Sequence, residues 1–225
     1  MATKLHPPLV RSDTVRRPRL EEALGRAVST LPFTLLSAPA GYGKTTMLAA
    51  LPHLLPGHAL AWITLDAEDN DPIRFVGLLT TALQRLHPDC GRSVWPWLSG
   101  GGTEGAGIKR AVGALINDIL GCLPDPFILV LDDLHFVTEP AVHIALEYLL
   151  DHQPPQLHLA VGTRHDPPLR LARLAARRQL GELRRPDLSF SPDEARQLLN
   201  DTLGLSLSAT EVTALQDRTE GWPAG

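Results

Sequence analysis

The feature that most constrains this 225-residue chain is a short glycine-containing loop between an apolar segment and the start of a helix. The apolar segment covers residues 33–37, the loop begins with Ala38-Pro39-Ala40-Gly41-Tyr42-Gly43, and Lys44-Thr45-Thr46 opens an apolar helical stretch. Glycines in such a loop let backbone N–H groups curl around phosphate oxygens, and the N-terminus of the following helix adds positive potential. The strand-loop-helix context therefore predicts a phosphate-binding P-loop.

Most of the residues that the sequence predicts to contact the nucleotide lie in the P-loop. The Lys44 ammonium is expected to reach the β and γ phosphates, and the Thr45 hydroxyl is expected to ligate Mg²⁺. Ala38 replaces the first glycine of the usual motif, but the inner glycines and the Lys-Thr pair are intact. The nucleotide-binding residues expected in the loop are Ala40, Gly41, Tyr42, Gly43, Lys44, Thr45 and Thr46.

A second motif is the acidic pair that follows an apolar run at residues 127–131. Carboxylates at the carboxyl end of a parallel strand lie beside the bound ligand. We expect Asp132 to hold Mg²⁺ through water at the nucleotide, so that Thr45 and Asp132 together form the metal site. Asp133 is the expected catalytic residue, at the position where related ATPases often place a glutamate that polarises the attacking water. Because an aspartate is one methylene shorter, the sequence predicts slow hydrolysis.

Two further polar residues follow the predicted strands. Arg164 comes after the apolar run at residues 157–161, where it can act catalytically as a sensor of the γ phosphate or be a plain surface charge. His135 lies two residues beyond Asp133 and can bridge to phosphate or water, although capping or packing is the favoured interpretation. The sequence leaves both interpretations of Arg164 open.

Apolar runs alternate with helical patterns along the chain. The runs expected to form strands are residues 33–37, 60–65, 127–131, 157–161 and 180–183. Continuous apolar strands between helices are what a parallel sheet covered on both faces requires. The predicted fold class is therefore α/β: a P-loop NTPase three-layer sandwich with a mainly parallel sheet, followed by the start of a helical lid domain.

Helical spacing of apolar residues predicts helices over residues 72–86 and 108–120. The intervening residues 88–107 contain tryptophans, prolines and a run of three glycines, a composition that favours a loop over any regular element. After Leu188 the pattern changes to short helical stretches, with cap-like starts at Ser191 and Ser208. We therefore expect a nucleotide-binding domain over residues 1–190 and the truncated start of a lid domain over residues 191–225.

The overall composition favours a folded domain in a reducing compartment. The net charge of -4 gives no electrostatic footprint for nucleic acid or an acidic membrane. Cys90 and Cys122 have no metal-ligand spacing, as expected of free thiols. The N-terminus lacks the apolar core of a signal peptide, and no apolar run is long enough for a membrane helix. We expect a cytoplasmic protein without direct membrane or DNA contacts in these residues.

Together these motifs resemble the nucleotide-binding portion of the MalT-type large ATP-binding regulators of the LuxR family, which are signal-transduction ATPases with numerous domains. The resemblance spans nearly the whole chain. Its motifs are the P-loop from Ser37 to Thr46, Ala61–Asp66 with Asp69–Pro72, Leu131–His135, Thr163–Leu169, Leu180–Arg184 and Gly221–Gly225. The Ala38 departure matches this family's own version of the P-loop.

The resemblance implies further roles. Val15 and Arg17 look like the segment that lies beside the adenine, and Pro223 resembles a lid proline that contacts the base. Members of the family switch between an ADP-bound resting form and an ATP-bound form that self-associates within the full-length protein. They continue into winged-helix, sensor and DNA-binding modules, before which this sequence stops. We therefore expect an N-terminal fragment that does not itself bind DNA.

The leading hypothesis is an ATP-binding, slowly hydrolysing regulatory switch that uses ATP, ADP and Mg²⁺. An alternative is an active AAA-like ATPase that couples hydrolysis to mechanical remodelling, which requires an arginine finger that the sequence does not identify. A third hypothesis is a scaffold that binds nucleotide only for stability. The rate of ATP turnover distinguishes the three.

Overall fold

A computed structural model of the chain describes residues 2–10, 14–99, 105–219 and 221. The described residues contain a five-stranded parallel sheet with the strand order β2-β3-β4-β1-β5. The strands are β1 (Phe33–Ser37), β2 (Ala59–Thr64), β3 (Phe127–Asp132), β4 (Leu157–Thr163) and β5 (Leu180–Arg184). All five predicted strands are confirmed, with small shifts at their ends.

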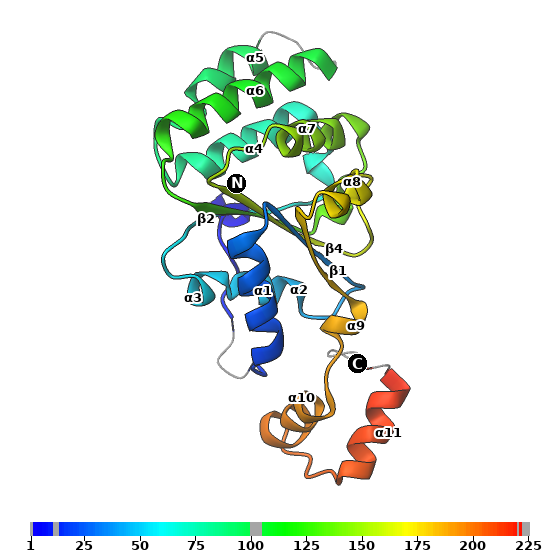
Figure 1. The fold of residues 1–225 in the computed structure, drawn as a ribbon. Helices are drawn as coiled ribbons and strands as arrows, with labels where there is room; N and C mark the ends of the chain where they lie inside the picture. The colour runs from blue at the N-terminus through cyan, green and yellow to red at the C-terminus, as the bar shows by residue number, and fades with distance from the viewer. Residues whose placement is uncertain (1, 11–13, 100–104, 220, 222–225) are drawn as a thin grey trace.

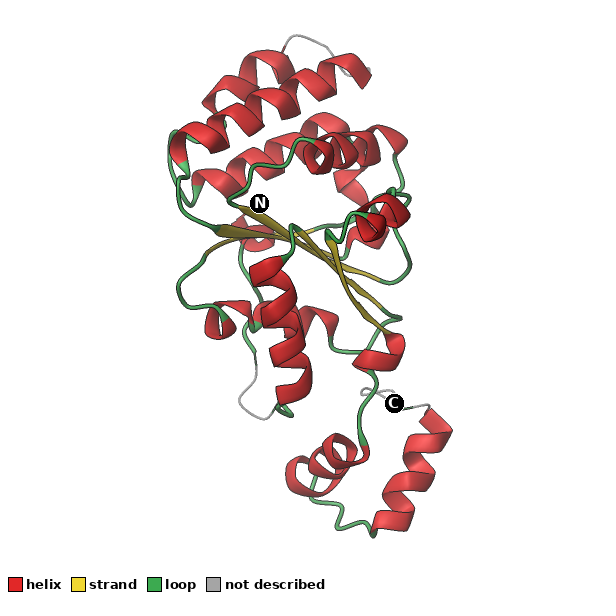
Figure 2. Cartoon of the chain, viewed as in Figure 1, coloured by secondary structure: helices red, strands yellow, loops and turns green. Residues whose placement is uncertain are grey.

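Helices cover both faces of this sheet, as Figures 1 and 2 show. The α-helices are α1 (Pro18–Thr30), α2 (Lys44–Ala49), α3 (Leu51–Leu54), α4 (Pro72–Gln84), α5 (Trp95–Ser99), α6 (Gly105–Cys122), α7 (Pro140–Asp151), α8 (Leu171–Ala176), α9 (Arg185–Leu188), α10 (Pro192–Arg196) and α11 (Ala209–Thr219). The shorter helical turns are η1 (Ala2–Leu5), η2 (Ala67–Asn70), η3 (Arg92–Val94), η4 (Leu134–Phe136) and the π-helical η5 (Gln197–Thr202). None of the helices in the described ranges is long and apolar enough to cross a bilayer.

Alternation along the buried strands divides the apolar side chains between two cores. Leu35 belongs to the core that α4, α6 and α7 cover, whereas its neighbour Leu36 belongs to the core beneath α1 and α2. Trp62 and Ile63 on β2 divide in the same way. Because side chains alternate along a strand, one continuous apolar run fills both cores. The predicted α/β three-layer sandwich is thus confirmed.

The strand order brings three strand ends together at the carboxyl edge of the sheet. β4 lies between β1 and β3, with Ser37 of β1 opposite Thr163 and Leu131 of β3 opposite Val161. Residues that follow these strands therefore face one shared region, although they are far apart in sequence.

The prediction of a loop over residues 88–107 is wrong for its described part. This stretch contains η3, α5 and the first turn of α6. Val94 and Leu98 are four residues apart on one helical face, and both are buried in the core. Burial of these side chains outweighs the local preference of the glycines and prolines for a loop. The three glycines at 100–102 lie outside the described residues.

Beyond β5 the chain forms a C-terminal helical segment (residues 189–219) that extends away from the helices flanking the sheet (Figure 1). The Ser191 hydroxyl accepts a hydrogen bond from the Glu194 N–H at 3.2 Å, and the Glu194 carboxylate accepts one from the Ser191 N–H at 2.9 Å. This capping box starts α10 where the sequence predicts a helix start. Ser208 caps α11 in the same way, through the Glu211 N–H at 3.3 Å.

Candidate nucleotide-binding site

The predicted P-loop joins β1 to α2 and contains two residues in the left-handed region. Gly41 has a φ of 83° and Gly43 a φ of 77°. A side chain at either position would be strained, because L-residues rarely adopt this conformation. Gly43 is also the N-cap of α2, which begins at Lys44. The loop conformation thus depends on the two glycines that the sequence singles out.

Lys44 lies buried at the centre of this loop. Its Nζ donates hydrogen bonds to the Ala38 carbonyl at 2.7 Å and the Pro39 carbonyl at 2.8 Å. Burial lowers the pKa of Lys44, and the charges of Asp133 and Asp132 act in the opposite direction. Both acids are therefore close enough to act electrostatically on this ammonium, and phosphate oxygens can replace the two loop carbonyls as its acceptors.

Asp132 is buried at the end of β3, with an exposed fraction of 1%. Burial raises its pKa to about 6, a shift that the Thr45 hydroxyl opposes by hydrogen bonding and that the Asp133 charge increases. Its Oδ1 has no hydrogen-bond partner among the described residues. A buried carboxylate oxygen without a partner, beside a threonine hydroxyl, matches the hard oxygen ligands that Mg²⁺ prefers.

Asp133 follows directly and has an unusual backbone conformation. Its φ of 58° and ψ of 36° place it in the left-handed region, which aspartate tolerates better than most residues. Its side chain is 33% exposed, and its Oδ1 lies 3.6 Å from Nδ1 of His135. Asp133 is thus accessible to solvent beside the buried Asp132.

His135 packs tightly but without a hydrogen-bonding role in the described structure. Its ring centroid lies 4.3 Å from that of Phe136, its side chain is 7% exposed, and both ring nitrogens are buried without a hydrogen-bond partner among the described residues. Burial lowers the pKa of His135 and the Asp133 charge raises it. Its ring therefore packs against Phe136, as the favoured interpretation of a packing histidine expects, and its Nδ1 lies near the carboxylate of Asp133.

Arg164 is exposed just beyond the end of β4. Its guanidinium carbon lies 5.9 Å from the centroid of the Phe136 ring. Its charge acts to lower the pKa values of both Lys44 and His135. The strand order thus brings Arg164 to the same region as the P-loop and the acidic pair.

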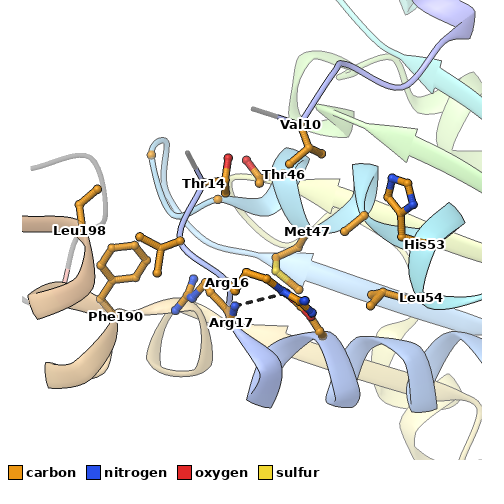
Figure 3. A pocket seen from close by; sticks show the side chains of 15 residues that line it. Val10, Thr14, Arg16, Arg17, Thr46, Met47, His53, Leu54, Phe190 and Leu198 are labelled. Atoms are coloured by element: carbon orange, nitrogen blue, oxygen red, sulfur yellow. Dashed lines mark hydrogen bonds and ion pairs between the residues drawn. The ribbon is translucent and has the colours of Figure 1, made fainter. Parts of the chain in front are cut away.

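A cavity of about 670 Å³ lies beside the P-loop (Figure 3). Gly41, Gly43 and Thr46 form part of its wall, and Val15 contributes an apolar side chain that is almost fully buried. The other lining residues are Val10, Thr14, Arg16, Arg17, Glu21, Met47, Ala50, His53, Leu54, Phe190 and Leu198. A mostly apolar cavity next to a phosphate-binding loop has the size and composition suited to a nucleoside.

Several of these wall residues are absent from the sequence-based prediction. Met47 comes from α2, and His53 and Leu54 come from α3. Phe190 and Leu198 come from the C-terminal helical segment. Of these five residues, only Met47 could have been predicted to lie at the site from its position in the sequence, since it directly follows the P-loop. Phe190 and Leu198 become neighbours of the P-loop through long-range packing that local periodicity does not encode.

Arg17 lines the cavity, but its guanidinium points to the C-terminal helical segment. It donates hydrogen bonds to the carbonyls of Leu188 at 3.0 Å and Ser189 at 2.8 Å, and to the Glu194 carboxylate at 3.0 Å. Its guanidinium carbon also lies 4.7 Å from the centroid of the Phe190 ring. Arg17 therefore joins the segment before α1 to residues that follow β5.

Pro223 lies outside the described residues. Gly221 of the same motif is described, with a φ of 69°, and its carbonyl accepts a hydrogen bond from the Phe190 N–H at 2.9 Å. The start of the motif thus contacts a residue of the cavity wall.

Comparison with known proteins gives one domain family and several long relatives. The family model described as "AAA ATPase domain" matches residues 11–161. The chain is 35% identical to the HTH-type transcriptional regulator MalT of Yersinia enterocolitica over 98% of its own length and 24% of the relative. It is 34% identical to the serine/threonine-protein kinase PknK of Mycobacterium tuberculosis over 99% of its length and 20% of the kinase. The chain thus spans a quarter or less of the length of these relatives.

A solved structure supports the fold. A Walker-type ATPase of Pyrococcus abyssi superposes with a TM-score of 0.56 at 17% identity, covering 100% of this chain and 69% of the other. The predicted resemblance to the nucleotide-binding portion of MalT-type regulators is confirmed by the MalT relatives and the domain model together.

Proposed function

Because the chain belongs to the AAA ATPase domain family, we propose that it is the nucleotide-dependent switch module of a MalT-like regulator. In this proposal the module binds ATP or ADP with Mg²⁺ and hydrolyses ATP slowly. The observation that carries it is the convergence of Lys44, Thr45 and Asp132 at one sheet edge, beside a cavity of about 670 Å³.

Each side chain has a distinct task in this proposal. When nucleotide binds, the Lys44 ammonium donates its hydrogen bonds to phosphate oxygens instead of to the two loop carbonyls. Thr45 and Asp132 would hold Mg²⁺. When bound, Mg²⁺ would neutralise part of the negative charge of the phosphates. Asp133 accepts a hydrogen bond from the attacking water, since its carboxylate is the accessible one of the acidic pair. Arg164 interacts with the γ phosphate and thereby distinguishes ATP from ADP.

The nucleoside occupies the cavity beside the loop. Val15 and Met47 offer apolar contacts to a planar base, and Thr46 and the two loop glycines connect the cavity to the phosphates. We propose Val15 as a residue that contacts the base, and Ala40 and Tyr42 as residues of the loop that binds the phosphates. Pro223 is proposed as a further base contact on the resemblance alone.

Slow hydrolysis distinguishes a switch from a motor. Asp133 is shorter than a catalytic glutamate, so its carboxylate is less able to reach a water in line with the γ phosphate. Matching sequences occur in proteins named as a transcriptional regulator and as a protein kinase, which supports a shared regulatory module over a task specific to either. We further propose that the full-length protein self-associates in its ATP state and is cytoplasmic, in keeping with its free thiols.

The test is the rate of phosphate release from Mg-ATP by the purified chain and by Asp133→Asn. The proposal predicts a wild-type turnover well below about 1 per second. It also predicts that Asp133→Asn binds ATP with unchanged affinity and hydrolyses it at least tenfold more slowly. A sustained turnover of about 1 per second or more would favour the motor, and wild-type hydrolysis at the background rate would favour the scaffold.

A further inference from the structure

The contact between Arg17 and Glu194 joins the cavity wall, to which Arg17 belongs, to the C-terminal helical segment that carries Glu194. Their side chains are only 6% and 9% exposed, and the Arg17 Nη2 lies 3.0 Å from the Glu194 Oε2. A buried ion pair is costly to break on one side, because the remaining charge loses both its partner and its access to water. The two residues therefore constrain each other strongly.

Both partners are fixed to their own elements. The Arg17 N–H donates to the Glu21 carboxylate at 3.3 Å, at the start of α1. The Glu194 carboxylate also caps α10 by accepting from the Ser191 N–H at 2.9 Å. Motion of α10 away from α1 therefore requires the loss of the ion pair.

We propose that Arg17 and Glu194 form a clasp that holds the C-terminal helical segment over the cavity and sets the rate of nucleotide release. The inference rests on the proposed function, because it assigns the cavity to a nucleotide. The clasp residues are positioning residues: they act through the wall that Phe190 and Leu198 contribute (Figure 3).

The bonding of Arg17 supports a clasp over a direct base contact. The hydrogen bonds of its Nη1 and Nη2 go to Leu188, Ser189 and Glu194, all of which follow β5. The Phe190 ring lies against the same guanidinium. If Arg17 acted only by touching the base, removal of the Glu194 charge would leave nucleotide release unchanged.

The chain offers a matched control on the same helix. Asp193 precedes Glu194 and is 91% exposed, where it pairs with Arg196 at 3.5 Å. Asp193→Asn and Glu194→Gln each neutralise one carboxylate of α10, but only the second removes the ion pair with Arg17. If the loss of any negative charge on α10 changed the rate of nucleotide release, both variants would show the change.

The experiment measures release of a fluorescent ADP analogue from the whole chain by stopped flow, after mixing with excess unlabelled ADP. We expect Glu194→Gln to release the analogue at least tenfold faster than the wild type, and Asp193→Asn to stay within about twofold. A single turnover of pre-bound ATP should retain its hydrolysis rate constant in Glu194→Gln, because no reacting group is changed.

A double variant tests whether the two residues act as a pair. Arg17→Gln with Glu194→Gln should release the analogue no faster than Arg17→Gln alone, whereas multiplied effects would show independent action and overturn the clasp. Thermal unfolding without nucleotide checks that each variant is folded. If Glu194→Gln does not fold, Glu194→Asp can replace it, because aspartate keeps the negative charge on a side chain that is one methylene shorter. We expect Glu194→Asp to accelerate release by a smaller factor.

The outcomes separate the clasp from the proposed function. A wild-type chain that binds the analogue, combined with release from Glu194→Gln at the wild-type rate, contradicts the clasp alone. A wild-type chain that binds no analogue overturns both the proposed function and the clasp that depends on it.

Discussion

The carboxylate of Asp132 lies against Gly162 on the neighbouring strand, so closely that a Cβ on Gly162 would stand 2.5 Å from Asp132 Oδ1. The same Cβ would meet Cδ1 of Leu48 at 2.9 Å. The absence of a side chain at position 162 is therefore what allows the acid of β3 to lie beside the P-loop helix.

Gly162→Ala should displace Asp132 and weaken nucleotide binding in the presence of Mg²⁺. The added methyl should also cost about 1–3 kcal/mol of unfolding free energy, because the site cannot accommodate it without shifts. Calorimetric titration with ATP, with and without Mg²⁺, measures the first effect, and urea unfolding the second. Gly77→Ala on α4 is the control, since a Cβ there would meet no atom within 4 Å among the described residues outside its own helix turn. Equal Mg-ATP affinities of Gly162→Ala and the wild type would contradict this role of Asp132.

Helix α5 carries one buried and one exposed large apolar side chain next to each other. Leu98 is 8% exposed, whereas Trp97 beside it is 43% exposed. Leu98→Ala should reduce the unfolding free energy by about 2–4 kcal/mol through loss of buried area and a residual cavity. Trp97→Ala should have a much smaller effect. Urea unfolding of both variants makes the comparison, and equal stabilities would show that α5 is not packed as described.

The P-loop and the strands could be predicted from the sequence, because each is encoded in consecutive residues. The η3–α5 segment could not, since its stability comes from burial of Val94 and Leu98 in the core shared with α4 and α6, which local composition does not reveal. The close approach of Gly162 to Asp132 depends on strand register, which a fully apolar run does not reveal. For Arg17, the resemblance implied a place beside the adenine, but the hydrogen-bond partners of its guanidinium are more than 170 residues away along the chain.

The stability of the fold in acid should depend on the ion pair between Asp166, just beyond β4, and Arg184, at the end of β5. Hydrogen bonds from Arg184 and Ser37 hold the pKa of Asp166 below its usual range. Because the folded pKa is lowered, the stabilisation is fully present above the unfolded pKa of about 3.9 and is lost as the pH falls from there through the lower folded pKa. The unfolding temperatures of the wild type and Asp166→Asn should thus differ at neutral pH, and the difference should shrink as the pH falls from about 4 through the lower folded pKa of Asp166. If the unfolding temperatures of the wild type and Asp166→Asn still differed in strong acid, the charge of Asp166 would not be the cause of the difference.

The most direct test of the nucleotide site is thermal unfolding of the chain with and without Mg-ATP or Mg-ADP. A ligand that binds only the folded state raises stability by mass action, by about 2.7 kcal/mol at a hundredfold excess over Kd. For a chain of this size the unfolding temperature should rise by about 5–10 °C. We predict this rise for the wild type and its loss in Lys44→Ala, because Lys44 Nζ is the buried cation of the P-loop. An equal rise in Lys44→Ala, or no rise in the wild type with either nucleotide, would contradict the assignment of the site.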